Sequence, residues 1–343
     1  MRSIPYLAAT WCLGYAALAL SWVLGAPVFP FGADDPRGAD MGSWWSGATP
    51  GWTGALFAVA CAAGAVAALA AARGQRVAAV VLIPLAVVLA LVVPDVRVLQ
   101  NLAYSFGGYF GLVDWPVLNQ VLCLAGGALL ALTAVLLLRR PPCPECLRPA
   151  AEPGRRERWL RIGRWAVVAA IVAQLPYGVQ RAAWNFGIPL GVSQQFVDEL
   201  AADIDRKGMP QAAMWILVGP DVLGALLTLG LVMAWGERLP AWVPFLGGRR
   251  VPISLAVVPA TVVSIAVTVA GLAIYRFALD KGGVSGAGVP GLLWVPWGVA
   301  LATATVAYVM RRRRTCDGAC EGRGARPGEG RGARPCAAPA VTV

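Results

Sequence analysis

Eight apolar stretches of helical length run through this sequence and leave it few possible folds. A hydrocarbon core about 30 Å thick needs about 20 apolar residues per helix. Because lipid offers no hydrogen-bond partners to an open strand, we expect each stretch to be helical. The predicted spans lie near residues 6–26, 52–72, 77–94, 116–138, 165–186, 211–235, 251–275 and 291–310.

Composition supports an all-α polytopic transmembrane bundle. The chain is 58% hydrophobic and only 14% charged, whereas about a quarter of the residues in soluble domains are charged. This balance excludes a soluble globular enzyme, a disordered protein and a coiled coil. Histidine is absent, which removes His-ligated haem, His-based metal centres and Ser-His-Asp catalysis.

Arginine placement predicts the orientation of the bundle. The formal net charge is +11, and the excess of arginine falls in alternate connections and at both chain ends. The positive-inside rule places those segments in the cytoplasm. We therefore expect a multi-pass protein of the cell membrane, with an uncleaved first helix and both termini cytoplasmic. The basic segments are Arg2, 73–76, 139–164, 236–250 and the chain from Arg311.

Two segments between the spans have their own patterns. Residues 98–113 are apolar enough to touch the membrane, but a span there would move the arginine-rich 139–164 segment outside. We expect an outer-leaflet or re-entrant piece packed on protein. Residues 193–208 show apolar positions at helical spacing, with Ser193 as N-cap and Gly208 as stop, which predicts an amphipathic surface helix.

The spans divide into two predicted four-helix repeats, residues 1–138 and 165–314. The motif Trp-x-x-Gly-x-Pro occurs at 22–27 and again at 184–189, and each copy ends the first helix of its repeat. An even number of spans per repeat predicts parallel repeats, related by an axis along the membrane normal. Chance similarity between apolar helices is the alternative.

Some of these segments resemble a known family. Residues 22–32, 116–127 and 184–193 are similar to an uncharacterised family of multi-pass membrane proteins common in high-GC Gram-positive bacteria. Each half also resembles a short four-helix membrane domain of unknown function. The resemblance extends to about residue 314 and implies an eight-helix membrane fold. It implies no activity, cofactor or catalytic residue.

Two basic segments outside the spans are expected to face anionic lipid headgroups: the linker 139–164 and the tail 315–343. Each arginine near an anionic leaflet adds about 1 kcal/mol of attraction. The tail is rich in Arg, Gly and Pro and cannot build a core, so it is predicted to be disordered. Neither segment shows a nucleic-acid interface, so the bilayer is the expected partner, and the sequence does not identify a protein partner.

Polar residues within the spans are the candidates for function, because they are costly at membrane depth. Asp221 follows Gly219-Pro220, a sequence that breaks or kinks a helix, about ten residues into the predicted sixth span. Arg181 on the preceding helix is a potential partner, and Gln174, Asn119 and Gln120 add hydrogen-bonding groups. The alternative is a structural network that fixes helix register.

Four cysteines on the predicted cytoplasmic side have spacings of metal ligands. Cys143 and Cys146 form a Cys-x-x-Cys pair, which suits half of a Cys₄ zinc site. Cys316 and Cys320 offer a weaker second pair in the tail. Structural disulfides are not expected in a reducing compartment. No catalytic residue and no cofactor other than this zinc is predicted.

Three function classes remain open. A transporter-like bundle for a small solute or ion is favoured by Asp221, Arg181 and Pro220. A non-catalytic scaffold or sensor, which would dock a cytoplasmic partner or anionic lipid, is the alternative. A membrane-embedded enzyme has the least support, because the sequence shows no acid–base set.

Overall fold

The protein is helical throughout the part of the chain that can be described. The computed structural model describes residues 3–105, 110–139, 154–206, 215, 218–239, 241 and 247–313. Within those residues, an isolated antiparallel bridge between Arg238 and Arg250 is the only extended pairing. The all-helical fold predicted from the apolar stretches is confirmed for these residues.

Six helical segments are long and apolar enough to cross a membrane, which indicates a multi-pass membrane protein. Their apolar residues are exposed around much of each helix, as lipid-facing helices require. The six are α1 (Ile4–Val23), α2 (Pro50–Ala72), α5 (Trp115–Leu138), α6 (Arg155–Asn185), α9 (Ile253–Lys281) and the segment Val289–Arg312, which contains α10 (Trp294–Arg312).

The other two predicted spans are shorter than expected. The segment predicted at 77–94 is Arg76–Val92, made of a 3₁₀ turn, α3 (Ala79–Val87) and a π-helical segment (Val88–Val92). Pro84 lies inside α3 and removes one backbone hydrogen bond.

The segment predicted at 211–235 contains α8 (Val218–Gly230). The chain turns after Gly230, because the ring of Trp235 folds back against that glycine. Residues 211–214 and 216–217 are outside the described residues.

Two short helices lie between the long ones. The predicted re-entrant or surface segment 98–113 contains α4 (Arg97–Ser105), which is too short to span. The amphipathic helix predicted at 193–208 is α7 (Gln194–Arg206). Ser193 caps α7 as expected, since the Phe196 backbone N–H donates to Ser193 Oγ at 3.2 Å.

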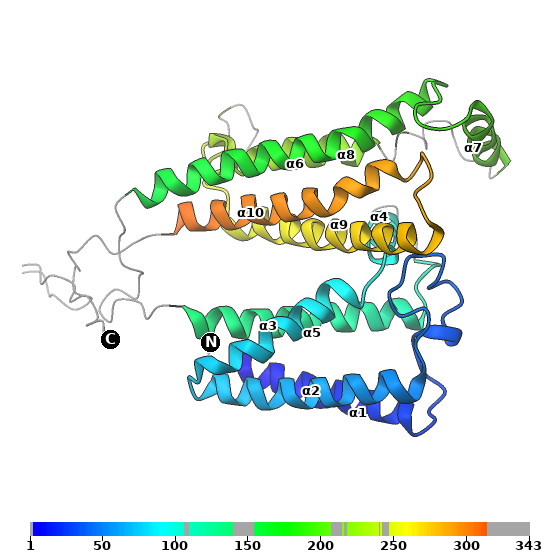
Figure 1. Cartoon of the computed structure of the whole chain (residues 1–343). Coiled ribbons are helices and arrows are strands. Elements are labelled where there is room, and N and C mark those ends of the chain that lie inside the picture. Colours follow the sequence, from blue (N-terminus) through cyan, green and yellow to red (C-terminus); the bar gives the residue numbers. More distant parts are fainter. Residues whose placement is uncertain are drawn as a thin grey trace, which may run out of the picture.

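The long helices lie side by side in two groups (Figure 1). The first half comprises α1–α5 and the second half α6–α10. We call the end of the bundle where α1 begins and α10 finishes the terminal end, and the opposite end the loop end. The loop end carries α4, α7 and the connection 24–49, which joins α1 to α2.

The core of the first half is aromatic where α1 meets the 24–49 connection. Trp22 is 1% exposed, and its ring packs edge-on against Phe29 and Phe31. Phe31 also stacks on Phe57 of α2, with ring centroids 5.8 Å apart. This connection is therefore a folded cap, inserted into the helix bundle.

Small residues and Arg311 hold the second half together. A β-carbon at Gly298 of α10 would overlap Thr268 Oγ1 of α9, so these helices pack in close contact. At the terminal end, Arg311 donates to the carbonyl of Leu231 at 3.1 Å and pairs with Glu237 at 2.9 Å. Arg311, the first arginine of the basic C-terminal run, thus also ties down the chain after α8.

The two halves meet near the loop end. There α9 packs against α4 and the π-helical segment. Gly42 lies against the backbone of Ala273 without room for a β-carbon, and Arg276 lies 5.9 Å from the centre of the Trp44 ring.

The two copies of the Trp-x-x-Gly-x-Pro motif have the same local structure. Trp22 and Trp184 are both buried, at 1% and 2% exposure. Gly25 and Gly187 both take positive φ, of 90° and 73°, a conformation that glycine accepts without strain. In each copy the glycine N–H donates to the tryptophan carbonyl, so one helix-ending geometry appears twice.

Candidate functional site

Asp221 is held by a glutamine of the neighbouring helix. Gln174 Nε2 on α6 donates to Asp221 Oδ1 at 2.9 Å and to the Asp221 carbonyl at 2.6 Å. Asp221 lies in the first turn of α8, where the helix dipole favours a negative charge. Gln174, rather than the expected Arg181, Asn119 or Gln120, is therefore the partner of this carboxylate.

A glycine on α6 allows the carboxylate to come close. A β-carbon at Gly178 would overlap Asp221 Oδ2. Gly178 is one helical turn from Gln174, so both residues face α8. Gly178 precedes the end of α6 at Asn185 by seven residues, or about 10 Å. Asp221 thus lies beside the last third of a spanning helix, about 10 Å from the end of that helix, although it is near the start of its own.

Arg181 lies on the same face of α6, one turn further towards the loop end. Its guanidinium lies 4.3 Å from the Trp184 ring centre and 5.1 Å from that of Tyr177. No ion pair joins Arg181 to Asp221, both of which are described residues. Within the described residues, the buried Arg181 Nε and Gln174 Oε1 have no hydrogen-bond partner. This face of α6 therefore has both a donor and an acceptor free for a ligand or water.

Asn119 belongs to a separate network in the core of the first half. Tyr15 O–H donates to Asn119 Oδ1 at 3.0 Å, and Cys123 Sγ donates to Tyr15 Oη at 3.1 Å. Cys12, Cys61 and Cys123 are fully buried, as expected for packing residues. Asn119 and Asp221 thus belong to different halves of the protein.

Gln120 joins a buried charged cluster that the sequence analysis did not single out. Arg97 forms a fork with Asp35, with N–O distances of 2.8 and 2.5 Å, and it also bonds both oxygens of Asp95. Gln120 Nε2 donates to Asp95 Oδ2 at 3.0 Å. All four side chains are at most 5% exposed. We call these four residues the charge knot.

The charge knot connects three parts of the first half. Asp35 comes from the 24–49 connection, Asp95 and Arg97 from the corner before α4, and Gln120 from α5. Burial alone would lower the pKa of Arg97, but hydrogen bonds to Asp95 and Asp35 outweigh it and raise that pKa. Every nitrogen of the Arg97 guanidinium group is bonded. The knot therefore acts as a structural clamp.

A half-exposed ion pair lies at the same end. Arg37 bonds Asp114 at 2.5 Å, with side-chain exposures of 37% and 40%. Asp114 also caps α5, because its Oδ1 accepts from the Val117 N–H at 3.1 Å. The pair adds a second link between the 24–49 connection and α5.

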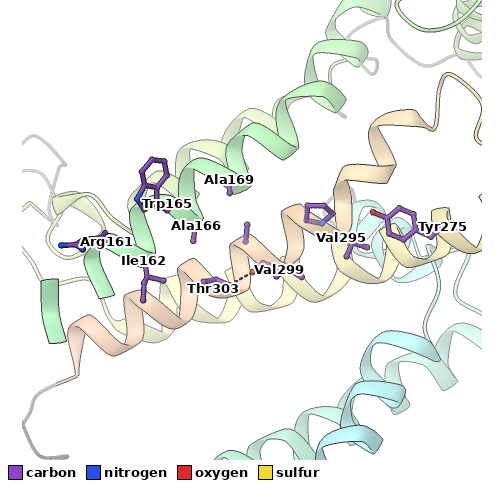
Figure 2. A pocket seen from close by; sticks show the side chains of 11 residues that line it. Arg161, Ile162, Trp165, Ala166, Ala169, Tyr275, Val295, Val299 and Thr303 are labelled. Carbon is purple, nitrogen blue, oxygen red and sulfur yellow. Dashed lines mark hydrogen bonds between the residues drawn. The ribbon is translucent and has the colours of Figure 1, made fainter. Parts of the chain in front are cut away.

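An open groove of about 710 Å³ runs along the second half between α6 and α10 (Figure 2). Apolar and small residues line most of it, with Arg161 at one end and Tyr275 of α9 at the other. A second groove of about 490 Å³ adjoins it and shares Arg161 and Trp165. Neither groove includes Asp221.

The predicted zinc ligands Cys143, Cys146, Cys316 and Cys320 lie outside the described residues. Where the chain is described, no group of three or more His, Cys, Asp or Glu side chains is arranged to hold a metal ion. The zinc site stays a prediction from spacing alone.

Comparisons with known proteins were made for the whole chain. No family model, curated protein or solved structure matches it. The resemblance to a family of eight-helix membrane proteins therefore stays a prediction. The proposal below consequently rests on the geometry of the helices and their polar side chains.

Proposed function

We propose that this protein is a transporter-like bundle that binds a small polar solute or ion beside Asp221. The observation that carries the proposal is a pair of buried atoms, Gln174 Oε1 and Arg181 Nε, on the α6 face that Asp221 packs against. Neither atom has a hydrogen-bond partner in the part of the chain that is described. A carboxylate and an amide oxygen accept hydrogen bonds or coordinate a cation, and a guanidinium donates to an anionic group. The site therefore suits a ligand that brings its own polar groups.

The charge knot provides a contrast within the same chain. Its arginine and two carboxylates satisfy one another and Gln120. Such a saturated cluster has no free group with which to recognise a ligand. Among the described residues, Asp221 has one partner outside its own helix, Gln174, and Gln174 keeps an oxygen without a hydrogen bond. Polar groups that remain incompletely bonded inside a membrane bundle mark paths for solutes and ions.

The placement of α8 supports the same proposal. Asp221 lies in the first turn of α8, yet beside Gln174 and Gly178 inside α6 rather than beside the end of α6. Transporters commonly form their sites near the bilayer midplane from interrupted helices, whose N-terminal ends face the bound groups. The end of α8 at Gly230, inside the predicted span 211–235, fits that pattern.

The topology that accompanies this function is eight crossings in two parallel repeats, with both termini cytoplasmic. The shared helix-ending geometry at Trp22 and Trp184 supports the duplication. The segment Arg76–Val92 contains 17 residues, about 26 Å of helix, which is close to a hydrocarbon thickness. The arginine distribution supports the orientation.

Accessibility to a charged reagent tests the solute site. In a chain whose native cysteines are replaced, Asp221→Cys is treated in membranes with a small cationic methanethiosulfonate. If a polar path reaches the site, Asp221→Cys is modified. Leu226→Cys on the same helix serves as the control, because Leu226 is 53% exposed on a lipid-facing surface and should stay unmodified.

The same experiment decides between the two function classes. Modification of Asp221→Cys at a rate above that of Leu226→Cys supports the transporter-like bundle. Equal, negligible rates in a folded chain overturn it and favour the non-catalytic scaffold. The scaffold has one specific observation behind it, since neither groove on the second half reaches Asp221.

A further inference from the structure

The groove between α6 and α10 has the shape and lining of a site for a hydrocarbon chain. Its walls are built from Ile162, Ala166 and Ala169 on α6 and from Val295, Val299 and Ala300 on α10 (Figure 2). The few polar groups in it are already bonded: Tyr275 O–H donates to the Leu292 carbonyl at 2.6 Å, and Thr303 Oγ1 donates to the Val299 carbonyl at 2.8 Å. An occupant therefore has to be apolar along the groove.

The end of the groove nearest the terminal end is basic. Arg161 lines both grooves, and Arg164 lines the second. Among the described residues, neither arginine makes an ion pair or a hydrogen bond. Glu157 also lines the second groove, which leaves these three side chains with a net positive charge. This end therefore attracts an anion.

Trp165 lies between the apolar and basic parts and belongs to both grooves. Its side chain is 71% exposed. A tryptophan in this position is typical of the membrane–water interface, where the ring faces hydrocarbon and the N–H faces headgroups. The apolar part of the groove thus lies on the hydrocarbon side of Trp165, where acyl chains are found. The two arginines lie on its water side, where the phosphate groups of a phospholipid are found.

We infer that this groove binds one anionic phospholipid, with an acyl chain between α6 and α10 and its phosphate at Arg161 and Arg164. Arginine presents a fork of N–H donors that matches phosphate oxygens. The inference is independent of the solute site, because no residue is shared between the two. It also specifies one place for the lipid, the start of α6, although the chain has basic residues in many other places.

Lipid titration of the purified full chain tests this inference. Native mass spectrometry in detergent measures binding of phosphatidylglycerol and of phosphatidylcholine. We expect phosphatidylglycerol to bind more tightly by about tenfold. The double variant Arg161→Gln/Arg164→Gln should lose that preference. The matched control is Arg73→Gln/Arg76→Gln, which removes the same charge from the turn between α2 and α3 and should keep the preference.

A second pair of variants tests the acyl chain. Ala169→Trp adds bulk to the groove and should weaken binding of both lipids. Val172→Trp, on the same helix at a residue that is 59% exposed and outside both grooves, should not. Equal affinity for the two lipids in the unaltered chain overturns the inference. So does an effect of the Arg73/Arg76 variant as large as that of the Arg161/Arg164 variant.

Discussion

Arg97 and Asp35 lie 62 residues apart in the sequence and form a two-bonded ion pair that is almost completely buried. The pair fastens the 24–49 connection to the corner before α4. Charged side chains of this kind are rarely buried without a partner, and here Asp95 and Gln120 supply the remaining bonds. This contact therefore ties two segments of the loop end of the first half together.

Breaking the charge knot should destabilise the protein strongly. Arg97→Gln leaves two buried carboxylates without a cation, which costs about 3–5 kcal/mol. Thermal unfolding in detergent, followed by circular dichroism, measures the loss. Arg37→Gln is the control, since its pair with Asp114 is half-exposed and is worth at most about 1 kcal/mol. A similar loss in both variants would contradict the assignment of the knot as a clamp.

The close approach of α6 and α8 should depend on Gly178. In Gly178→Ala the added β-carbon overlaps Asp221 Oδ2, so the carboxylate must leave Gln174 or the helices must separate. We expect a loss of about 1–3 kcal/mol in the same melting experiment, together with altered modification of Asp221→Cys. Gly219→Ala has open space around the new atom and should be neutral or slightly stabilising. An unchanged Gly178→Ala protein would show that the contact is loose.

The two copies of the repeated motif should respond alike to substitution. Gly25→Ala and Gly187→Ala each place a β-carbon on a residue with positive φ, which costs about 1–2 kcal/mol. Both sites have open space around them, so the cost is conformational and should be similar. Gly51→Ala, with ordinary φ and open space, is the control. Unequal effects on stability would indicate that the two helix ends share a backbone conformation but not its energetic cost.

The orientation can be tested with reporter fusions. Fusions after residues 150 and 330 should both report the cytoplasm, because the basic linker and tail are retained there. A fusion after residue 190, in the connection after α6, should report the outside. A periplasmic or extracellular signal at 150 or 330 would overturn the predicted map.

The sequence predicted the long helices well because length and apolarity decide which segments can span. It could not show that α3 is followed by a π-helical turn or that α8 ends at Gly230, since both depend on contacts with neighbouring segments. For the candidate site, Gln174, Gly178 and Arg181 have the spacing of one helix face, a signal that was available before the structure. Asp35 was not predicted, because a charge in a long polar connection is typical of a solvated loop.

The contact between the halves lies near one end of α9, at Ala273. Ala273, where Gly42 touches it, lies 20 residues from Ile253 at the other end of the helix, a distance of about 30 Å. A rotation of about 10° about that fulcrum would move the far end of α9 by about 5 Å, given that arm. A small rotation at the loop end would thus become a larger displacement of the residues that border the beginning of α9.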